Sequence, residues 1–290
     1  MTGIVLAKTR SLLEMIKFSH TVFAFPFALT GATLAALANG APPTAAQIAW
    51  LCLAMIGARS GAMGLNRIID ASIDADNPRT ASRHIPAGKV GRGEAWALVL
   101  VSFALLLLAA WMLNPLCFYL APVALFFLIL YSYCKRFTAL AHLVLGLCLA
   151  AAPVGAWIAL RGDLQWPIVV LGLAVLFWVA GFDIFYALQD LEFDRARGLF
   201  SIPSQLGAER SVWLARLFHL LMLGLLLLLP LGTGLGGIYL FGVLVVAAML
   251  LYEHRLVKPD DLTRLDAAFF NMNGYISVTI FAFTLIDALM

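Results

Sequence analysis

Residues 166–194 read WPIVVLGLAVLFWVAGFDIFYALQDLEFD, and this stretch decides the fold class. Up to Gln189 it carries a single charged side chain, Asp183. An apolar run of this length suits an α-helix that crosses a bilayer, because roughly 17–25 residues span the hydrocarbon core. The whole chain agrees: its 290 residues are 63% hydrophobic and 12% charged, against about 45–50% and about 25% in a typical soluble domain. The sequence therefore predicts an all-α, polytopic membrane protein.

Nine apolar runs of this kind follow one another along the chain. They cover residues 18–38, 46–69, 94–113, 116–133, 139–160, 166–189, 211–229, 233–252 and 268–288. The connections are too short for a separate folded domain, and the two longest polar ones lie at 70–93 and 190–210. Charges are mixed into the residues before the first run, so no cleavable signal peptide is expected. We expect one bundle of nine transmembrane helices over residues 1–290.

The lysines and arginines gather in alternate connections. With the N-terminus inside, all 19 fall on inside segments except Arg161, in an outside loop, and Arg59, within a span. This bias follows the positive-inside rule. It predicts an integral membrane protein, of a bacterial inner membrane, with both long polar loops forming a cytoplasmic cap and the C-terminus outside. The net charge of +3 is then explained by topology, and no nucleic-acid partner is needed.

Two acidic clusters stand at matching places, each at the end of an apolar run. The first acidic stripe is Asn66, Asp70 and Asp74, and the second is Asp183, Tyr186, Asp190 and Asp194. Residues four apart share one helix face, about 6 Å apart along the axis. Each stripe is followed by a basic, turn-rich segment that contains Ile-Pro: NPRTASRHIPAG at 77–88 and RARGLFSIPSQLG at 195–207. The parallel predicts an internal repeat, with helices 1–4 and 5–8 as its halves and helix 9 added.

These acids need a cation to compensate them. The macrodipole disfavours acids at helix C-termini by about 0.3–1 kcal/mol each, and an unpaired charge as deep as Asp183 costs at least roughly 2.5 kcal/mol. Simple helix capping by water-exposed acids therefore fits poorly. Oxygen ligands without His or Cys suit Mg²⁺, which usually shares its carboxylates with phosphate oxygens. The stripes thus favour a magnesium site with a diphosphate substrate.

Several basic residues could complete such a site. The basic residues of the two polar loops and of one helix end could hold phosphate oxygens, although positive-inside placement also explains several of them: Arg79, Arg83, Lys89, Lys135, Arg136, Arg195 and Arg197. Of these, Lys135 and Arg136 stand directly at a helix end and are favoured as functional. Arg59 lies seven residues before Asn66, on the same face and about 10 Å deeper. It either pairs with an acid such as Asp183 or grips a carboxylate on a substrate, and both interpretations stay open.

Two other features near these residues favour packing or membrane contact over chemistry. Gly57, Ser60, Gly61 and Gly64 give the helix around Arg59 a small-residue face, which lets a neighbouring helix approach closely. Lys17 and His20, at the start of the first run, could approach the site but are more typical of interfacial anchors.

With these residues the chain resembles the UbiA superfamily of intramembrane prenyltransferases, most closely its 4-hydroxybenzoate polyprenyltransferase branch. The segments that carry the likeness are NRIIDASID at 66–74, YSYCKRFT at 131–138 and DIFYALQDLEFD at 183–194, together with Arg59. The first family motif, N(D/R)xxDxxxD, falls on the first stripe, and the second, DxxxD, falls on Asp190 and Asp194. Position 67 is Arg here, where many members have Asp, so one acidic ligand is missing.

The resemblance implies Mg²⁺-dependent transfer of a polyprenyl group from polyprenyl diphosphate to the ring of a hydroxylated aromatic acid, as a step of quinone biosynthesis. The implied metal ligands are Asn66, Asp70, Asp74, Asp190 and Asp194. The implied substrate-binding residues are Arg59 for the aromatic carboxylate and Arg67, Arg79, Lys135 and Arg136 for the diphosphate. Asp183 or Tyr186 would contact the phenol or steady the allylic cation, and Arg67 either binds phosphate or points into the headgroups.

Other functions remain as alternatives. Within the family, the acceptor could be a menaquinone-pathway naphthoate, a futalosine-route precursor or haem. An ion-coupled transporter is the alternative from a different class, although both stripes lie at one membrane face and no pair of broken helices is evident. A CDP-alcohol phosphotransferase or an intramembrane aspartyl protease would need D-G-x-x-A-R or G-x-G-D strings, which the chain lacks.

Overall fold

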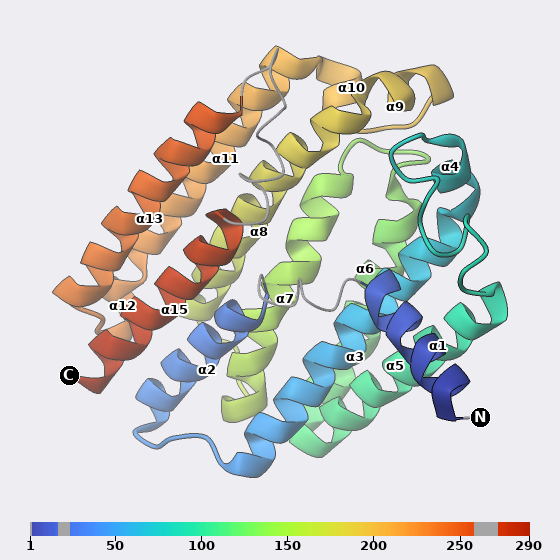
Figure 1. Cartoon of the computed structure of the whole chain (residues 1–290). Coiled ribbons are helices and arrows are strands. Elements are labelled where there is room, and N and C mark those ends of the chain that lie inside the picture. Colours follow the sequence, from blue (N-terminus) through green and yellow to red (C-terminus); the bar gives the residue numbers. More distant parts are fainter. Residues whose placement is uncertain (1, 17–23, 258–271) are drawn as a thin grey trace. The chain divides into compact units, whose positions relative to one another are not determined.

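The computed structural model describes residues 2–16, 24–257 and 272–290, and over these residues every regular element is a helix (Figure 1). The predicted all-α class is confirmed. Lys17 and His20, which we considered as residues near a site, lie outside the described residues.

Seven helices among the described residues are long and apolar enough to cross a membrane, so the chain is an integral membrane protein. These spans are α3 (Ala45–Ile69), α5 (Arg92–Leu113), α6 (Pro115–Cys134), α7 (Ala141–Arg161), α8 (Trp166–Ala187, continued to Arg197), α11 (Ala208–Leu228, continued to Thr233 by α12, Pro230–Thr233) and α13 (Gly237–Leu256). Two shorter apolar helices are α2 (Phe25–Asn39) and α15 (Asn273–Leu289). Each predicted run thus overlaps a helix, whereas a count of nine spans is not confirmed.

Two details of the helix pattern differ from the prediction. The eighth run, expected at 233–252, forms a helix four residues later, because Gly234 ends α12 with a positive φ of 74° and α13 begins only at Gly237. A helix that we did not predict, α1 (Thr2–Met15), precedes the first apolar run.

The chain divides into two compact units that interleave in sequence. One unit takes Met1–Thr21 and Ile48–Tyr133, and the other takes Val22–Gln47 and Cys134–Met290. We call them unit 1 and unit 2. The helix expected to open the first half of the repeat, α2, therefore belongs to unit 2, where it packs against α7 and α15. The predicted repeat of helices 1–4 and 5–8 within one domain stays a prediction.

Unit 1 is held together by close helix packing. Met15 and Ile16, at the end of α1, share a buried cluster with Leu65 of α3 and Val99 of α5.

The small-residue face of α3 lies against α5. A Cβ on Gly57 would stand 2.6 Å from the carbonyl oxygen of Ser102, and one on Gly64 would stand 2.9 Å from the Val99 side chain. The predicted close approach of a neighbouring helix is confirmed, since a larger side chain at Gly57 would meet backbone.

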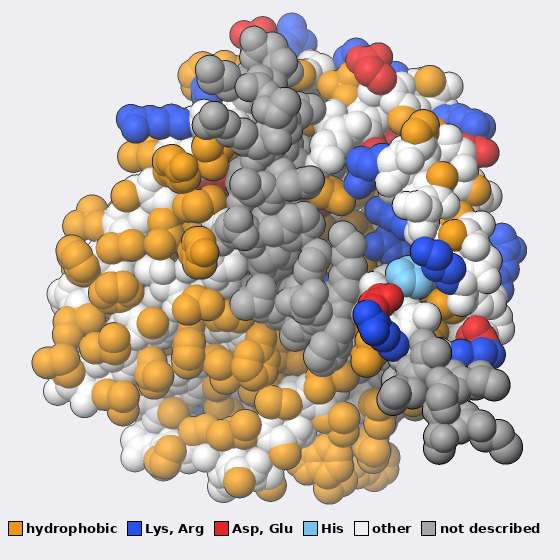
Figure 2. Space-filling model, viewed as in Figure 1, with side chains coloured by type: hydrophobic (Ala, Val, Ile, Leu, Met, Phe, Trp, Pro, Cys, Tyr) orange, Lys and Arg blue, Asp and Glu red, His pale blue; other side chains and the backbone are white. Residues whose placement is uncertain are grey.

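Unit 2 is built around α8. This helix packs between α7 and α11, and Trp178 near its middle is fully buried. A Cβ on Gly146 of α7 would collide with the carbonyl oxygen of Leu176 in α8, so glycine permits this contact. Over α13 and α12 the face seen in Figure 2 is nearly all hydrophobic, while Lys and Arg side chains gather toward the end of the unit where α9 and α10 lie. An apolar surface of this kind suits contact with lipid.

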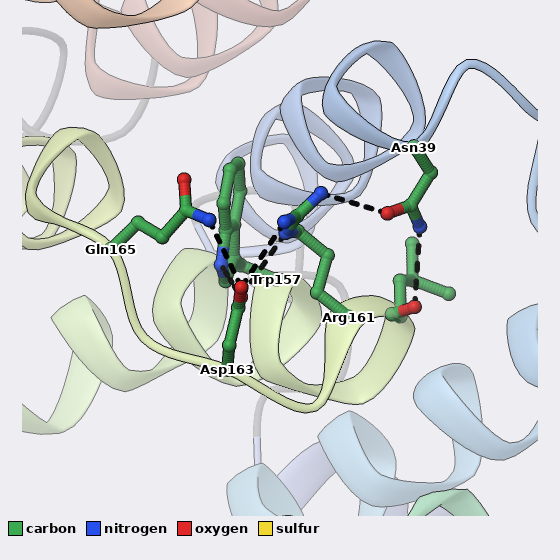
Figure 3. Close-up of polar contacts among 6 residues, drawn as sticks. Asn39, Trp157, Arg161, Asp163 and Gln165 are labelled. Atoms are coloured by element: carbon green, nitrogen blue, oxygen red, sulfur yellow. Dashed lines mark hydrogen bonds and ion pairs between the residues drawn. The ribbon is translucent and has the colours of Figure 1, made fainter.

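A hydrogen-bonded network closes the other end of unit 2, after α7 (Figure 3). Asp163 accepts hydrogen bonds from the Trp157 indole at 3.0 Å, from Arg161 at 3.1 Å and from Gln165 at 2.9 Å. Arg161 also donates to the Asn39 side chain of α2 at 2.8 Å. The hydrogen bond from Arg161 lowers the pKa of the Asp163 carboxyl below its ordinary value. The network ties the loop after α7 to α2.

Candidate active site

The first acidic stripe lies across a break between two helices. α3 ends at Ile69, and a short helix, α4 (Ala71–Asp76), begins after Asp70. Helical spacing nevertheless continues, because the Asp70 N–H donates to the Asn66 carbonyl at 2.9 Å and the Asp74 N–H donates to the Asp70 carbonyl at 2.8 Å. The Asn66 side chain also donates to Asp70 Oδ2 at 2.9 Å. The three side chains therefore keep the common face that the sequence predicts.

The second acidic stripe has the same construction. α8 ends at Ala187, a 3-10 turn covers Leu188–Asp190, and α9 (Leu191–Arg197) follows. Asp70 and Asp190 each occupy the position before the new helix with nearly equal backbone angles, φ −88° and ψ 2° against φ −102° and ψ 5°. This equivalence supports the predicted correspondence between the two stripes.

The breaks correct one expectation about electrostatics. We expected the acids at the C-termini of long helices, where the macrodipole disfavours them. Asp74 and Asp194 instead lie in the first turns of α4 and α9, the ends at which a negative charge is favoured. Part of the expected electrostatic cost is therefore absent.

The Asp74 carboxylate is almost fully buried and is only half satisfied. Oδ1 accepts a hydrogen bond from the Arg83 guanidinium at 2.6 Å, and the Thr80 hydroxyl donates to the Asp74 carbonyl at 3.0 Å. Oδ2 is buried without a hydrogen-bond partner in the described part of the chain. A buried carboxylate oxygen without a partner is costly, and oxygen is the donor that Mg²⁺ prefers. The Asp74 side chain therefore fits a metal ligand.

The predicted arginines of unit 1 occupy different surroundings. Arg67 is buried, with 6% of its surface exposed, and its Nε points at the Met15 carbonyl at the end of α1, 3.5 Å away. It therefore does not point into the headgroups. Arg79 is exposed on the first loop, where its backbone N–H donates to the Asn77 side chain. Arg59 is partly buried in α3, two turns before Asn66.

Asp183 is bonded within unit 2. Its Oδ2 lies 2.7 Å from His142 Nδ1 of α7, and the Ile202 backbone N–H, at the start of α10 (Ile202–Leu206), donates to His142 Nε2 at 3.2 Å. Among the described residues this histidine is the only polar contact of the Asp183 side chain. The considered pair of Arg59 with Asp183 stays a prediction, because Arg59 belongs to unit 1 and Asp183 to unit 2.

The second polar loop, within residues 190–210, is held by hydrogen bonds beside Lys135. The Phe200 N–H donates to the Lys135 carbonyl at 2.8 Å, and Arg195 Nε donates to the Ser204 carbonyl at 3.1 Å. Asp194 interacts with the Ser201 hydroxyl and lies within electrostatic reach of Lys135, Asp190 and His142.

The remaining predicted residues at this end are Tyr186 and Arg136. The Tyr186 ring packs against the buried cluster that includes Ile184 and Leu188, and Arg136 is partly buried beside Lys135. Unit 2 thus gathers Lys135, Asp183, Tyr186, Asp190 and Asp194 near the ends of α6 and α8 and in α9.

Comparison with known proteins decides the family. Residues 24–275 match the model described as the UbiA prenyltransferase family. The chain belongs to the UbiA prenyltransferase family. A 4-hydroxybenzoate octaprenyltransferase of Vibrio campbellii is 31% identical over 222 residues, which cover 77% of this chain and 78% of the relative. The resemblance noted from the sequence motifs is confirmed, and the protein is a prenyltransferase enzyme, which sets the transporter interpretation aside.

Solved structures of UbiA homologs share the fold. The apo structure of a homolog from Aeropyrum pernix K1 matches with a TM-score of 0.83 and 32% identity, over 93% of this chain and 98% of that one. A homolog from Archaeoglobus fulgidus bound to DMAPP and Mg²⁺ matches with a TM-score of 0.76, over 97% and 99% of the two chains. Because its identity is 18%, this second likeness shows the fold alone.

The predicted metal ligands of this UbiA-family chain divide between the units. Asn66, Asp70 and Asp74 belong to unit 1, and Asp190 and Asp194 belong to unit 2. Among the described residues, no group of three or more His, Cys, Asp or Glu side chains forms a metal cluster. The five-residue ligand set therefore stays a prediction.

Two polar partners of the predicted site were missed from the sequence. Arg83 pairs with Asp74 across a turn-rich loop, nine residues further on, and His142 reaches Asp183 from a different helix. Neither pair has a helical spacing, so only the folded loop and the packing of α7 on α8 reveal them. Arg83 was predicted to hold phosphate and not to pair with Asp74, and His142 lies in an apolar run as a lone histidine.

Proposed function

We propose that this prenyltransferase transfers a polyprenyl group from polyprenyl diphosphate to the ring of 4-hydroxybenzoate, with Mg²⁺, as a step of quinone biosynthesis. The observation that carries the proposal is the match to the Vibrio campbellii 4-hydroxybenzoate octaprenyltransferase over 77% of the chain. The two acidic stripes, with oxygen donors only, agree with this chemistry. The bacterial relative also supports a place in the bacterial inner membrane.

The acceptor would be recognised by charge. Arg59 is a guanidinium within the apolar helix α3, and a carboxylate on the aromatic ring would give it a bidentate partner. The pairing would be strong, because few waters compete inside a membrane helix bundle. Arg59 would thereby select aromatic acids over neutral phenols.

The donor diphosphate would be held by basic side chains and by metal. Arg79, Lys135 and Arg136 supply positive charge for its oxygens, and Arg67 completes the proposed set. Asn66, Asp70 and Asp74 in unit 1, and Asp190 and Asp194 in unit 2, would supply ligands to Mg²⁺. When bound, the metal would neutralise the charge that develops on the departing diphosphate.

Asp183 and Tyr186 would act on the acceptor and the cation. The Asp183 carboxylate, 16% exposed, would contact the phenol and take up the ring proton. The partly buried Tyr186 ring would steady the allylic cation through its negative face. The apolar surroundings of α8 would keep water from the cation.

The proposal is tested with the purified protein in liposomes, supplied with Mg²⁺ and a labelled polyprenyl diphosphate. The acceptor panel holds 4-hydroxybenzoate, a dihydroxynaphthoate, a futalosine-route precursor and haem. Prenylated product from 4-hydroxybenzoate is expected. Product from another acceptor alone would assign the same chemistry to that acceptor, and the absence of product from the whole panel would contradict the proposal.

A further inference from the structure

The contact between His142 and Asp183 joins three separate elements of unit 2. His142 is buried, with a side chain 4% exposed, whereas the Asp183 side chain is 16% exposed. The imidazole lies between the carboxylate on α8, at 2.7 Å, and the first backbone N–H of α10, at 3.2 Å. A single ring thus ties α7, the predicted acceptor-contacting acid and the second loop together.

The hydrogen bonds determine which nitrogen of His142 carries the proton. The Ile202 N–H can only donate, so Nε2 must accept and holds no hydrogen. Nδ1 is therefore the protonated nitrogen, and it donates to Asp183 Oδ2. This tautomer leaves the imidazole no site at which to take a proton from Asp183 while the Ile202 contact persists.

We propose that His142 is a positioning residue, which orients the Asp183 carboxylate for the acceptor, while the Ile202 contact fixes the tautomer that donates to Asp183. The inference rests on the proposed function, in which Asp183 contacts the aromatic acceptor. Because His142 occupies Oδ2, the other oxygen, Oδ1, is the one directed to the substrate.

The reaction defines what the oriented oxygen does. The allylic C–O bond of the donor breaks with its electron pair going to the diphosphate, and the ring supplies the pair for the new C–C bond. The ring C–H proton then passes to Asp183 Oδ1, and its bonding pair restores the aromatic ring. A proton acceptor must lie within hydrogen-bond reach of that proton, so the direction of one carboxylate oxygen affects the rate.

A purely structural tie between α7 and α8 is the competing explanation. These helices already touch closely where Gly146 meets the Leu176 carbonyl, so a polar tie is not needed to bring them together. The chain of contacts through His142 also ends on the backbone of α10, beyond both helices. A role confined to helix packing would not require this second hydrogen bond.

Two substitutions separate the two contacts of His142. In His142→Asn the side-chain amide N–H takes the place of Nδ1–H and keeps a donor for Asp183, while the acceptor for Ile202 is lost. In His142→Gln the terminal amide takes the place of Nε2, so its oxygen can accept from Ile202 while the donor to Asp183 is lost. We expect kcat of His142→Gln to fall by about 100-fold, as a misplaced catalytic group does, with an unchanged KM for the prenyl donor. His142→Asn should recover most of that loss.

His219→Asn is the matched control. His219 is also a buried histidine of unit 2, and it bridges His254 of α13 at 2.9 Å and the Trp178 carbonyl of α8 at 3.3 Å. Its loss should lower thermal stability without changing kcat per folded molecule. Each variant is therefore compared at equal folded protein, measured by thermal unfolding.

A double-mutant cycle with Asp183→Asn decides between the explanations. If His142 acts through Asp183, adding His142→Gln to Asp183→Asn causes little further loss of kcat. A full additional loss, or equal losses in His142→Gln and His142→Asn, would overturn the proposal. Full activity of Asp183→Asn would overturn it as well, by removing Asp183 from the reaction.

The nitrogen-15 resonances of His142 give a readout that does not depend on turnover. A proton on Nδ1 in the wild type is expected, and a proton on Nε2 would contradict the proposal whatever the activity. A wild type that prenylates no aromatic acid, yet shows the Nδ1–H tautomer, would instead contradict the proposed function.

Discussion

The two carboxylate oxygens of Asp74 lie in different environments. Arg83 neutralises Oδ1 from within the same loop, while Oδ2 is buried without a hydrogen-bond partner among the described residues. An arginine beside a ligand oxygen competes with a metal ion for that oxygen. The side chain therefore suits a site in which only one of its oxygens meets a metal.

The acids of the two stripes should be essential for metal-dependent transfer. Asp70→Ala and Asp190→Ala each remove a proposed Mg²⁺ ligand, so both should abolish prenyl transfer in reconstituted membranes, and chelation of Mg²⁺ should do the same in the wild type. Product formation is measured at several Mg²⁺ concentrations.

Glu192→Gln is the matched control for this prediction. Glu192 lies on the same short helix α9 but is exposed, two residues from Asp190. It should keep wild-type activity. Full activity in Asp70→Ala or Asp190→Ala would show that the stripe does not hold the metal.

Arg59 should affect one substrate and not the other. Because its guanidinium is proposed to bind the aromatic carboxylate, Arg59→Ala should raise the KM of the aromatic acid by about 10- to 100-fold, the loss of roughly 1.5–3 kcal/mol from a charged hydrogen bond. The KM of the prenyl donor should stay unchanged. Steady-state kinetics with each substrate varied in turn measure both values, and equal effects on the two would make Arg59 structural.

For single residues, the sequence predicted which side chains share a helix face, but it did not predict their hydrogen-bond partners. The stripe Asn66, Asp70 and Asp74 could be predicted, because helical spacing alone puts residues four apart on one face. The partners Arg83 and His142 could not, since their contacts depend on a loop conformation and on which helices pack together. The surroundings of Arg67, buried beside the Met15 carbonyl, depend on α1, a helix that was not predicted.

At the scale of elements, the apolar runs correctly predicted where helices lie, but they predicted the first and last residues of those helices less accurately. An apolar composition identifies a membrane span because charged side chains are costly in lipid. The span is then helical because every backbone group must bond within its own helix. The ends depend on local backbone chemistry, as in the Pro230 to Gly237 segment, where a short helix and Gly234 delay α13. The break at Asp70 was missed because the helical hydrogen bonds continue through it, and the 3-10 turn at Leu188–Asp190 was missed because it also depends on local backbone chemistry.

The close contact of α7 with α8 gives a prediction with a control on the same helix. Gly146→Ala would place a methyl group against the Leu176 carbonyl, so overpacking should destabilise the protein by about 1–3 kcal/mol. Gly155→Ala meets nothing within 4 Å, and it should be neutral or stabilising by up to about 1 kcal/mol. Thermal unfolding of the two variants in detergent measures the difference, and equal midpoints would contradict the packing.

At the scale of the whole molecule, sequence order does not reveal the two units. α2 is the first of the predicted apolar helices, yet it packs with α7 and α15 in unit 2, which continues at Cys134 after the intervening stretch. Contacts between segments so far apart arise from tertiary packing, which periodicity and composition do not report. Membership of the UbiA family, in contrast, could be predicted from short motifs alone.

The predicted topology can be tested with single cysteines. Ser82 lies on the first polar loop and Leu164 in the loop after α7, and both are exposed. In a chain whose native cysteines are replaced, Leu164→Cys should react with an impermeant maleimide in intact spheroplasts, and Ser82→Cys only after permeabilisation. Labelling of both before permeabilisation would contradict the cytoplasmic placement of the first loop.

The continuous hydrogen bonds across Asp70 also limit which changes in chain length are tolerated. Each residue advances a helix by about 100°, so a one-residue insertion or deletion between Asn66 and Asp74 would turn part of the stripe away from the rest. Ile68, Ile69 and Ala71 can change identity without this effect, provided that the spacing stays. The same arithmetic applies between Asp190 and Asp194. The segments at 77–91 and 198–207 lie outside both stripes, but their length is constrained as well, because Arg83 bonds to Asp74 and the Ile202 N–H bonds to His142. Variation in length among functional versions of this chain should therefore be confined to the connections farther from the acids, such as the loop after α7.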